Sequence, residues 1–377
     1  MKSWFLYEKK YAGLALVLSA LMIILGWFLN EFARSSQYQQ LLLPPLEVSF
    51  DVNTTTGRFE SWYTHTPITA SAATIKKDAV ARRQNLLHLI AESRYDSDTS
   101  PVREEFLEET NSYTAYTLYI PTEKGYPPVG ARLYIPKGLK KPAPAILFTH
   151  GHFEDNTLFQ RPAGEGGAAN FHAVKHAEAG FITLAVENRG TGYFRSRQGF
   201  SQIEYINYEL LQNRSFVALA IQDARKALAY LRSRPDVDTS RIGVAGVSLG
   251  GELAGFISAL DQNIKAVVVS GYLNLYQGLL VSTSVHDLFW PGILSRVGEA
   301  PQIISLIAPR PLLIQQGTED IEFYAAGYRR NNGDNAFEYV MDYYSLLGHE
   351  KDVQRDLFIG GHIYSSTGSI EFFNRQL

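Results

Sequence analysis

The sequence predicts an α/β fold in which helices flank a mostly parallel central sheet. The first observation is a series of short apolar runs of strand length, at 145–149, 181–186, 241–247, 264–270 and 311–316, with a further short strand expected at 355–359. The second is that helical patterns lie between such runs, as at 249–260. Runs that lack a polar alternation are typical of strands covered on both faces, which is the arrangement of parallel sheets.

An uncharged apolar segment near the N-terminus predicts one transmembrane helix before the α/β domain. No charged residue occurs from Tyr11 to Leu29. As a helix, these roughly 19 residues would span about 28 Å, close to the bilayer's hydrocarbon core of about 30 Å. Preceding lysines favour a cytoplasmic tail at 1–10, a signal anchor in the lipid bilayer at 11–30, and an extracytoplasmic location for the remainder. A cleaved signal peptide is the alternative, but Glu31 stands where its cleavage site requires a small residue.

Residues 31–110 are expected to form a stalk and a helical extension, followed by the α/β domain at 111–377. The stretch begins polar, with Pro44-Pro45 and a threonine-rich turn at 54–57, as linkers do. From 71 to 93 the pattern becomes helical, and this helix is expected to pack on the α/β domain. Its apolar side comprises Ala79, Leu86, Leu87 and Ile90, and basic residues lie on the other side.

The motif Gly246-Val247-Ser248-Leu249-Gly250 joins the apolar run at 241–247 to a segment with helical spacing. A serine between strand and helix, flanked by two such glycines, is typical of a nucleophile elbow. This turn strains the serine backbone, and Gly246 and Gly250 lack the Cβ atoms that would collide where strand and helix approach each other. An ordinary Gly-Ser turn is the alternative. We expect Ser248 to be a nucleophile.

A nucleophilic serine needs a histidine base and an acid that orients it, and both have candidates after later strands. Asp320 follows the run at 311–316, and His362 follows the short strand expected at 355–359. Because the carboxyl ends of parallel strands lie at one edge of a sheet, these two residues and Ser248 are expected to meet there.

Each of the two has an alternative. Glu319 and Glu322 neighbour Asp320, and either is the acid if the loop is arranged differently. His349 is the alternative base, but no strand leads into it, and it is expected at a helix end or in a solvated loop.

Two backbone N–H groups are expected to form an oxyanion hole. One belongs to Leu249, the residue after the nucleophile, and the other to His152, in the loop after the run at 145–149. The imidazoles of His150 and His152 are expected to pack in the structure or line a pocket, without an acid–base role.

A substrate pocket is expected beneath the segment 271–298, where a sheet of this kind accepts insertions over the serine. Aromatic residues in this segment are typical of pocket walls, but they are equally common in cores. The candidates for the pocket are Tyr272, His286 and Trp290.

Composition and the remaining motifs exclude several classes of function. The net charge is −3, no basic region suits nucleic acid, and the absence of cysteine excludes disulfides, thiol catalysis and a lipoprotein anchor. Gly190-Thr191-Gly192 follows an apolar run, but Arg195 replaces the third glycine of a dinucleotide-binding motif. His172 and His176 have the spacing of zinc ligands without a third ligand, and a surface helix is expected there. We therefore expect neither a cofactor nor a metal.

Five blocks between about Tyr113 and Leu377 occur together and in order: PAPAILFTHGH, GFITLAVENRGTG, DARKALAYLRSRPDVDTSRIGVAGVSLGG, LIAPRPLLIQQGTED and GGH. They resemble the α/β-hydrolases of the dienelactone hydrolase and acetyl-xylan-esterase-like group. The resemblance implies the α/β-hydrolase fold with Ser248 as nucleophile, Asp320 as acid and His362 as base. It also implies a serine hydrolase that cleaves carboxylic esters through an acyl-enzyme, with short acyl groups, such as acetyl on carbohydrate, as the expected substrates.

Two other functions stay open. The same three residues would also serve an acyltransferase that uses a sugar or lipid hydroxyl at the membrane surface. A non-catalytic, membrane-tethered binding domain is the other alternative, although such a domain has no need to keep nucleophile, acid and base together.

Overall fold

The structure is a computed structural model that describes residues 38–46, 49–53, 58–62, 64–139, 142–152, 168–279, 290–324 and 327–377. Residues Leu41–Leu377 form one compact unit. Within the described ranges, no helix combines the length and the apolar character needed to span a bilayer. The predicted cytoplasmic tail, 1–10, and the predicted transmembrane helix, 11–30, lie outside the described residues.

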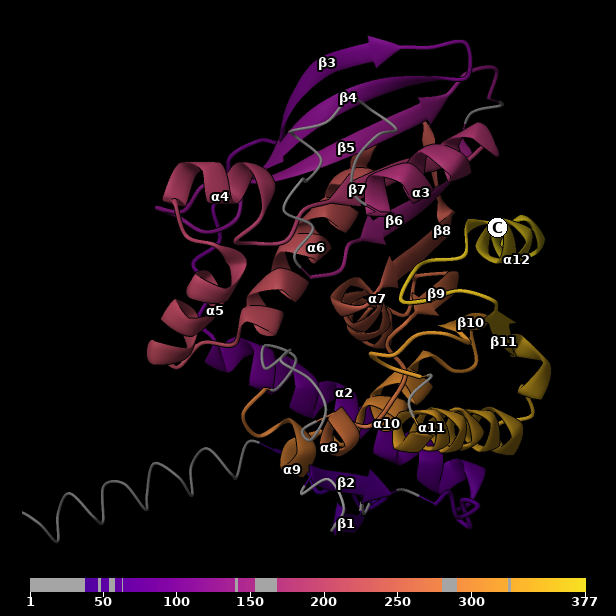
Figure 1. Ribbon diagram of the computed structural model, residues 1–377. Helices are drawn as coiled ribbons and strands as arrows, with labels where there is room; N and C mark the ends of the chain where they lie inside the picture. The colour runs from indigo at the N-terminus through magenta and orange to yellow at the C-terminus, as the bar shows by residue number, and fades with distance from the viewer. Residues whose placement is uncertain are drawn as a thin grey trace, which may run out of the picture. The chain divides into compact units, whose positions relative to one another are not determined.

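A nine-stranded sheet runs through the compact unit (Figure 1). Its spatial order is β11 (Val353–Phe358), β10 (Leu312–Gly317), β9 (Ala266–Ser270), β8 (Val237–Val247), β6 (Ala143–Thr149), β7 (Ile182–Val186), β5 (Val129–Pro136), β4 (Tyr113–Ile120) and β3 (Arg103–Glu109). Neighbouring strands from β11 to β7 are parallel, whereas β5, β4 and β3 continue the sheet in antiparallel fashion. The predicted α/β fold with a mostly parallel central sheet is confirmed.

Helices cover both faces of this sheet (Figure 1). The described helices are α2 (Ala72–Glu92), α3 (Ala168–Glu178), α4 (Gly192–Gln198), α5 (Gln202–Leu211), α6 (Phe216–Ser233), α7 (Leu249–Leu260), α8 (Tyr276–Leu279), α9 (Ile293–Arg296), α10 (Ala300–Ile304), α11 (Gly327–Leu346) and α12 (Ser366–Gln376). α3 and α12 pack on one face, and α6 and α7 pack on the other. Strand β6 shows why two layers form, because Phe148 joins the buried cluster beneath α3 and α12 while Thr149 Oγ1 donates to Gly250 O of α7.

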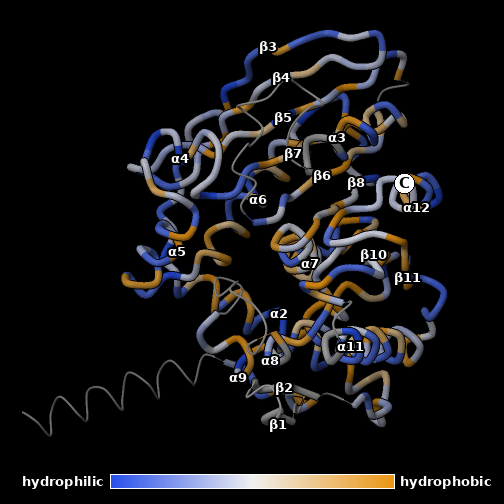
Figure 2. Tube along the Cα trace, viewed as in Figure 1, coloured by the Kyte–Doolittle hydropathy of each residue, from blue (hydrophilic) through white to orange (hydrophobic). Residues whose placement is uncertain are grey.

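The antiparallel edge of the sheet has no counterpart among the predicted strands. Strand β3 reads REEFLEE, most of its side chains are exposed, and Figure 2 shows it as largely hydrophilic. An edge strand of this kind lacks an apolar run, and its charges oppose pairing with another chain. Strand β3 lies within 31–110, where the sequence predicts only a stalk and a helix.

Residues from Leu41 onward, which include part of the predicted stalk, belong to the compact unit. β1 (Ser49–Asn53) and β2 (Arg58–Trp62) pair antiparallel, and the threonine-rich residues 54–57 between them lie outside the described residues. Leu42 and Leu43 precede β1 in the chain. Their N–H groups donate hydrogen bonds to Asp78 Oδ1 of α2, at 2.8 and 3.0 Å. The backbone N–H groups of Leu42 and Leu43 thus find a partner in α2.

Helix α2 lies where a helix is predicted, at 71–93, but its buried and exposed sides differ from the predicted ones. Three of its predicted apolar residues are buried: Ala79, Leu86 and Ile90. Leu87 is 43% exposed, however, and Arg82 is buried in an ion pair with Asp78 at 2.5 Å. Arg82 also donates to the carbonyl of Leu43. Leu42 and Leu43 thus contact a second side of α2, which the helical pattern alone does not reveal.

Helix α3 is buried where its two histidines lie, which corrects the expectation of a surface helix. His176 Nε2 is 2.8 Å from Ser369 Oγ of α12, and His172 Nδ1 is 2.6 Å from Ser366 Oγ. Burial lowers the pKa of His172 to about 4 and that of His176 to about 3. Both imidazoles are therefore neutral near pH 7 and join α3 to α12.

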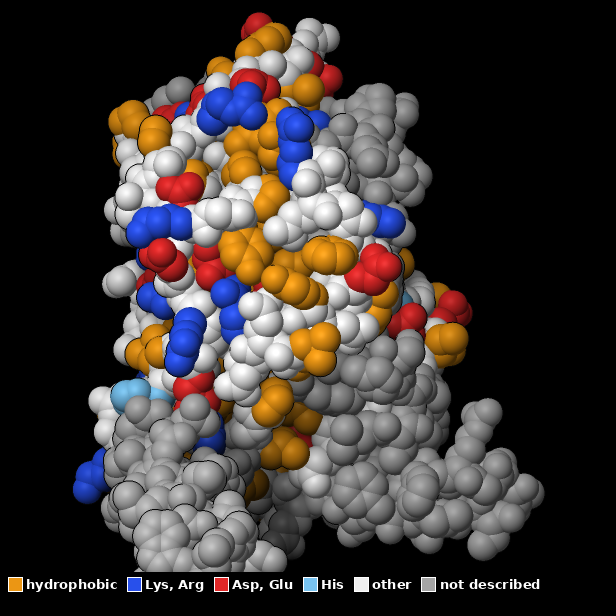
Figure 3. Space-filling model, turned by 90° about the vertical axis from the view of Figure 1, so that its left-hand side faces the viewer, with side chains coloured by type: hydrophobic (Ala, Val, Ile, Leu, Met, Phe, Trp, Pro, Cys, Tyr) orange, Lys and Arg blue, Asp and Glu red, His pale blue; other side chains and the backbone are white. Residues whose placement is uncertain are grey.

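Hydrophobic side chains gather on the face that carries α4 and α5 (Figure 3). Phe200 stacks on Tyr208 with ring centroids 5.6 Å apart, and Leu211 at the end of α5 is 88% exposed. Tyr205 and Ile206 of the same helix are buried. Helix α5 therefore has one apolar side in the core and further apolar residues at the surface.

Candidate active site

Ser248 occupies the turn between the end of β8 and the start of α7. Its dihedral angles are φ 58° and ψ −127°, a conformation that residues with a side chain rarely adopt. A Cβ on Gly246 would lie 2.1 Å from Gly250 O, and a Cβ on Gly250 would lie 2.1 Å from Thr149 O. The close approach of strand and helix thus requires both glycines, as predicted.

Asp320 and His362 lie in the loops that follow β10 and β11. Asp320 is 1% exposed, and its Oδ2 is 2.8 Å from His362 Nδ1. Since an ionised carboxylate only accepts hydrogen bonds, Nδ1 carries the proton, and Nε2 of the neutral imidazole is left as the basic atom. Nε2 is buried without a hydrogen-bond partner among the described residues.

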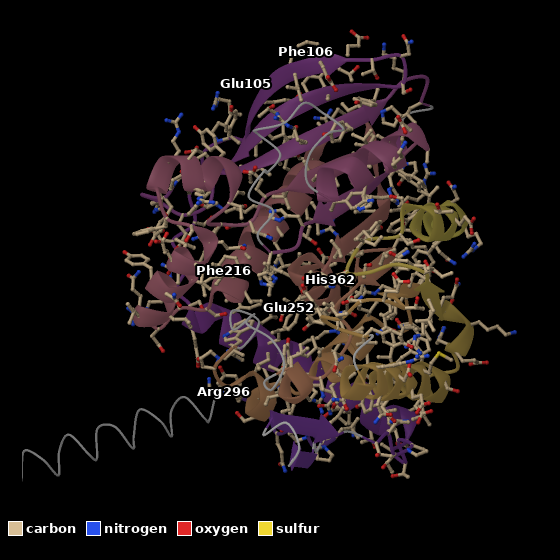
Figure 4. All side chains as sticks on the ribbon, in the orientation of Figure 1. Glu105, Phe106, Phe216, Glu252, Arg296 and His362 are labelled. Carbon is tan, nitrogen blue, oxygen red and sulfur yellow. The ribbon has the colours of Figure 1, made fainter. Side chains whose placement is uncertain are left out.

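The segment Ser270-Gly271, at the end of β9, links the serine to this pair. The N–H of Ser248 donates to Ser270 O at 3.0 Å. A Cβ on Gly271 would lie 3.2 Å from His362 Nδ1 and 3.6 Å from Asp320 Oδ2. Figure 4 shows His362 and Glu252, four residues after Ser248, near the centre of the molecule. Asp320 and His362 are thus in contact, and Ser248 is joined by its backbone to the residue before Gly271, which borders this pair.

The alternatives for the acid and the base lie in different surroundings. Glu319 is exposed, and its N–H donates to Gly360 O at 2.8 Å, which joins the loops after β10 and β11. Glu322 Oε2 lies 3.7 Å from His362 Nε2, on the other side of the ring from Asp320. His349 caps the short helix η3 (Glu350–Asp352), and its Nδ1 contacts Asp352 Oδ2 at 2.8 Å.

His362 has an electrostatic environment suited to holding a proton. Burial alone would lower its pKa, but the hydrogen bond and charge of Asp320, with the charge of Glu322, raise the pKa above its ordinary value. The ring of Phe323 stacks on the imidazole, with centroids 5.2 Å apart and planes 11° apart. The histidine is thus fixed in orientation by a carboxylate at one nitrogen and an aromatic ring on one face.

The segments that carry the predicted oxyanion donors border the serine. Leu249 is the first residue of α7, where backbone N–H groups have no acceptor within the helix. Gly151 lies against the serine, because a Cβ on Gly151 would be 3.2 Å from Ser248 Cβ, and His152 follows it directly. The structure therefore brings both predicted donor segments to Ser248.

The loop that contains Gly151 and His152 is fixed by a contact that the sequence does not reveal. Asn188 donates its backbone N–H to His150 Nε2 at 2.9 Å and its Nδ2 to His150 O at 3.0 Å. Nε2 is therefore an acceptor, so Nδ1 carries the proton and donates to Gly151 O at 2.7 Å. Burial lowers the pKa of His150 to about 4. This imidazole has a structural role, as expected.

The three predicted pocket residues have different surroundings. Tyr272 is 1% exposed and lies in a buried cluster, where its hydroxyl contacts Tyr276 Oη at 2.8 Å and Glu252 Oε1 at 3.3 Å. Trp290 is 6% exposed and lies near Phe256, with ring centroids 6.4 Å apart. Packing, the alternative to pocket lining, therefore describes Tyr272, whereas Trp290 also lines a small cavity together with Leu89 and Arg214. His286 lies outside the described residues.

Arg189 is the centre of a buried charge network that the sequence analysis missed. Its guanidinium donates to Asp223 from Nε and Nη2, at 2.5 and 3.0 Å, and from Nη1 to Glu123 at 2.5 Å. Arg214 donates to the same glutamate at 2.7 Å. The only sequence signal is Arg189 itself, a cation directly after a buried strand and next to Asn188, and its partners are far away in the chain.

Among the described residues, no group of three histidine, aspartate or glutamate side chains is arranged to hold a metal ion.

The sequence matches one family model and is similar to a known bacterial protein. The model of the acetyl xylan esterase (AXE1) family matches residues 90–284, about half of the chain. A Bacillus subtilis (strain 168) protein described as the putative hydrolase YtaP is 30% identical over 248 residues, which cover 63% of this chain and 80% of that protein.

Solved structures show the same fold at low sequence identity. A putative acetyl xylan esterase from Bacteroides fragilis NCTC 9343 superposes with a TM-score of 0.60 at 19% identity, over 78% of this chain and 76% of that one. A glucuronoyl esterase from Solibacter usitatus gives a TM-score of 0.56 at 16% identity, over 90% of this chain and 99% of that one.

Proposed function

Because the chain belongs to the acetyl xylan esterase family, we propose that it removes acetyl groups from carbohydrate esters with Ser248 as its nucleophile. The observation that supports this proposal best is the buried Asp320 paired with His362 at 2.8 Å, beside a serine in a strained turn. A domain that only binds a ligand needs neither the strained serine nor the buried acid.

The first half of the proposed reaction forms an acyl-enzyme. Ser248 Oγ attacks the ester carbonyl carbon while His362 Nε2 takes the hydroxyl proton, and the N–H groups of Leu249 and His152 donate to the oxyanion. The carbon–oxygen bond to the alcohol then breaks, and His362 returns its proton to the departing oxygen. Asp320 stabilises the imidazolium that exists between these two proton transfers.

The second half repeats these steps with water. His362 Nε2 takes a proton from the water molecule that attacks the acyl carbon, and the bond to Ser248 Oγ breaks as the serine recovers its proton. The products are acetate and the regenerated serine. An acyltransferase would differ only in using an alcohol in place of this water.

The activity is expected to depend on pH through His362. The base must be neutral, and its pKa is raised, so kcat/KM should rise with pH and its acid limb should lie above pH ~6.5, the ordinary histidine value. The measurement is kcat/KM for an acetyl ester between about pH 5 and 9. His349→Gln, which removes the alternative base, should leave the pH dependence of kcat/KM unchanged. An acid limb below pH ~6 would contradict His362 as a base paired with Asp320.

The direct test of the proposed function is acetate release from acetylated xylo-oligosaccharides, with Ser248→Ala measured in parallel. We expect release by the wild type and its loss in the variant. An added alcohol separates hydrolysis from transfer, because an acyltransferase would form a new ester instead of acetate. Absence of both products in a folded sample would contradict an acetylesterase.

We also propose that residues 11–30 anchor the protein in a membrane, with 1–10 in the cytoplasm and the α/β domain on the extracytoplasmic side. The support is the absence of charge from Tyr11 to Leu29 and the lysines before it. After alkaline carbonate extraction, the full chain is expected to sediment with membranes, and a chain that begins at residue 31 is expected to stay in the supernatant. Equal partition of the two chains would contradict the anchor.

A further inference from the structure

A second carboxylate lies beside the proposed base. Glu322 Oε2 is 3.7 Å from His362 Nε2, whereas Asp320 Oδ2 is hydrogen-bonded to the other ring nitrogen, Nδ1. The side chain of Glu322 is 53% exposed, so its carboxylate is in contact with water. At 3.7 Å the carboxylate forms no hydrogen bond to the imidazole, and its effect there is electrostatic.

The position of Glu322 is fixed by the turn that also positions the acid. Asp320 Oδ1 accepts hydrogen bonds from the N–H groups of Glu322 and Phe323, at 2.9 and 3.0 Å. Phe323 in turn stacks on His362. One turn therefore supplies three neighbours of the imidazole: a carboxylate at Nδ1, an aromatic ring on one face and a carboxylate near Nε2.

The nitrogen that Glu322 approaches is the one that handles the leaving group. In the proposed reaction, Nε2 returns its proton to the alcohol oxygen, so this oxygen must come within hydrogen-bond distance of Nε2. A carboxylate 3.7 Å from the same nitrogen is then close to the alcohol part of the ester. Charges a few ångströms apart near a protein surface interact appreciably at low salt, so we expect Glu322 to change kcat/KM for a charged ester by about three- to tenfold.

We propose that Glu322 is a specificity residue that selects substrates by the charge of their alcohol part. It favours esters of neutral or cationic alcohols and disfavours those that carry a carboxylate near the ester bond. On carbohydrate, this predicts a preference for acetyl groups on neutral sugars over acetyl groups on uronate residues. The inference rests on the proposed esterase function and names a property of the same site.

The test uses three acetyl esters that differ in the charge of the leaving phenol: meta-acetoxybenzoate, its methyl ester and meta-acetoxyphenyltrimethylammonium. For each enzyme, kcat/KM for the charged esters is divided by that for the neutral methyl ester. In Glu322→Gln, the ratio for the anionic ester should rise about three- to tenfold at low salt, and the ratio for the cationic ester should fall by a similar factor. Added salt should weaken the discrimination of the wild type and have less effect on the variant.

Glu319→Gln is the matched control, because it removes the same charge from an exposed position in the same loop. Its ratios should match those of the wild type. Unchanged ratios in Glu322→Gln, or equal changes in both variants, would overturn the proposal. Failure of the esterase function itself is distinguishable, because it would appear as absent hydrolysis of the neutral ester by the wild type or as its persistence in Ser248→Ala.

Discussion

Ser248→Ala is expected to lower the turnover of acetyl esters by about 10⁴- to 10⁶-fold. Alanine removes the Oγ atom that forms the acyl bond, while the Asp320–His362 pair and the predicted oxyanion donors stay in place. Ser248 is 6% exposed, and alanine keeps its Cβ, so packing at the turn is nearly preserved. The thermal unfolding midpoint of the variant should therefore stay close to that of the wild type.

Two measurements check this prediction. Acetate release gives the change in turnover, and a fluorophosphonate probe followed by mass mapping identifies any serine that is activated. Ser196→Ala, which removes an exposed hydroxyl from α4, is the matched control and should keep both activity and labelling. Retention of most activity by Ser248→Ala, or labelling of a different serine, would exclude the proposed nucleophile.

Arg189→Met is expected to lower the free energy of unfolding by about 3–5 kcal/mol. Arg189 is fully buried and donates two hydrogen bonds to Asp223 and one to Glu123. Glu123 keeps Arg214 in the variant, at 2.7 Å, whereas Asp223 keeps the hydroxyl of Tyr95, at 2.6 Å, as a neutral partner. The free energy of unfolding falls because the buried carboxylate of Asp223 would then lack its compensating cation.

The measurement is urea unfolding of the wild type and the variant under the same conditions. Lys137→Met provides a matched comparison, because Lys137 and Glu109 form an ion pair at 2.8 Å with side chains 40% and 58% exposed. Solvent screens such a pair, so its loss should cost less than about 1 kcal/mol. If the two substitutions have equal effects, the buried network does not contribute to stability in the way proposed.

The three residues of the proposed triad are predictable because each stands shortly after a segment that is expected to form a strand. Hydrophobic periodicity is a local property, and it places strands and turns without knowledge of distant contacts. Parallel strands then bring their carboxyl ends to one edge, so the sequence is enough to expect Ser248, Asp320 and His362 close together. The glycines around Ser248 are predictable for the same local reason, since a strand–turn–helix needs close backbone approach there.

Hydrophobic periodicity does not predict other elements, because they lack a local apolar pattern. Strand β3 is a charged edge strand, and Arg82 has the pattern of a residue on a basic helix face, although the N-terminal residues cover it. His172 and His176 likewise have the spacing of a surface pair, and only the packing of α12 on α3 explains their burial.

The sequence by itself determined the mostly parallel α/β fold and the position of each candidate triad residue at a strand end, because both depend on patterns within short segments. The tertiary structure alone decided which polar groups meet: Asn188 with His150, Arg189 with Asp223 and Glu123, and Tyr272 with Glu252. These pairs join residues far apart in the chain. A buried polar group must find a partner to offset its desolvation, and that partner is set by how distant segments pack, which no local pattern specifies.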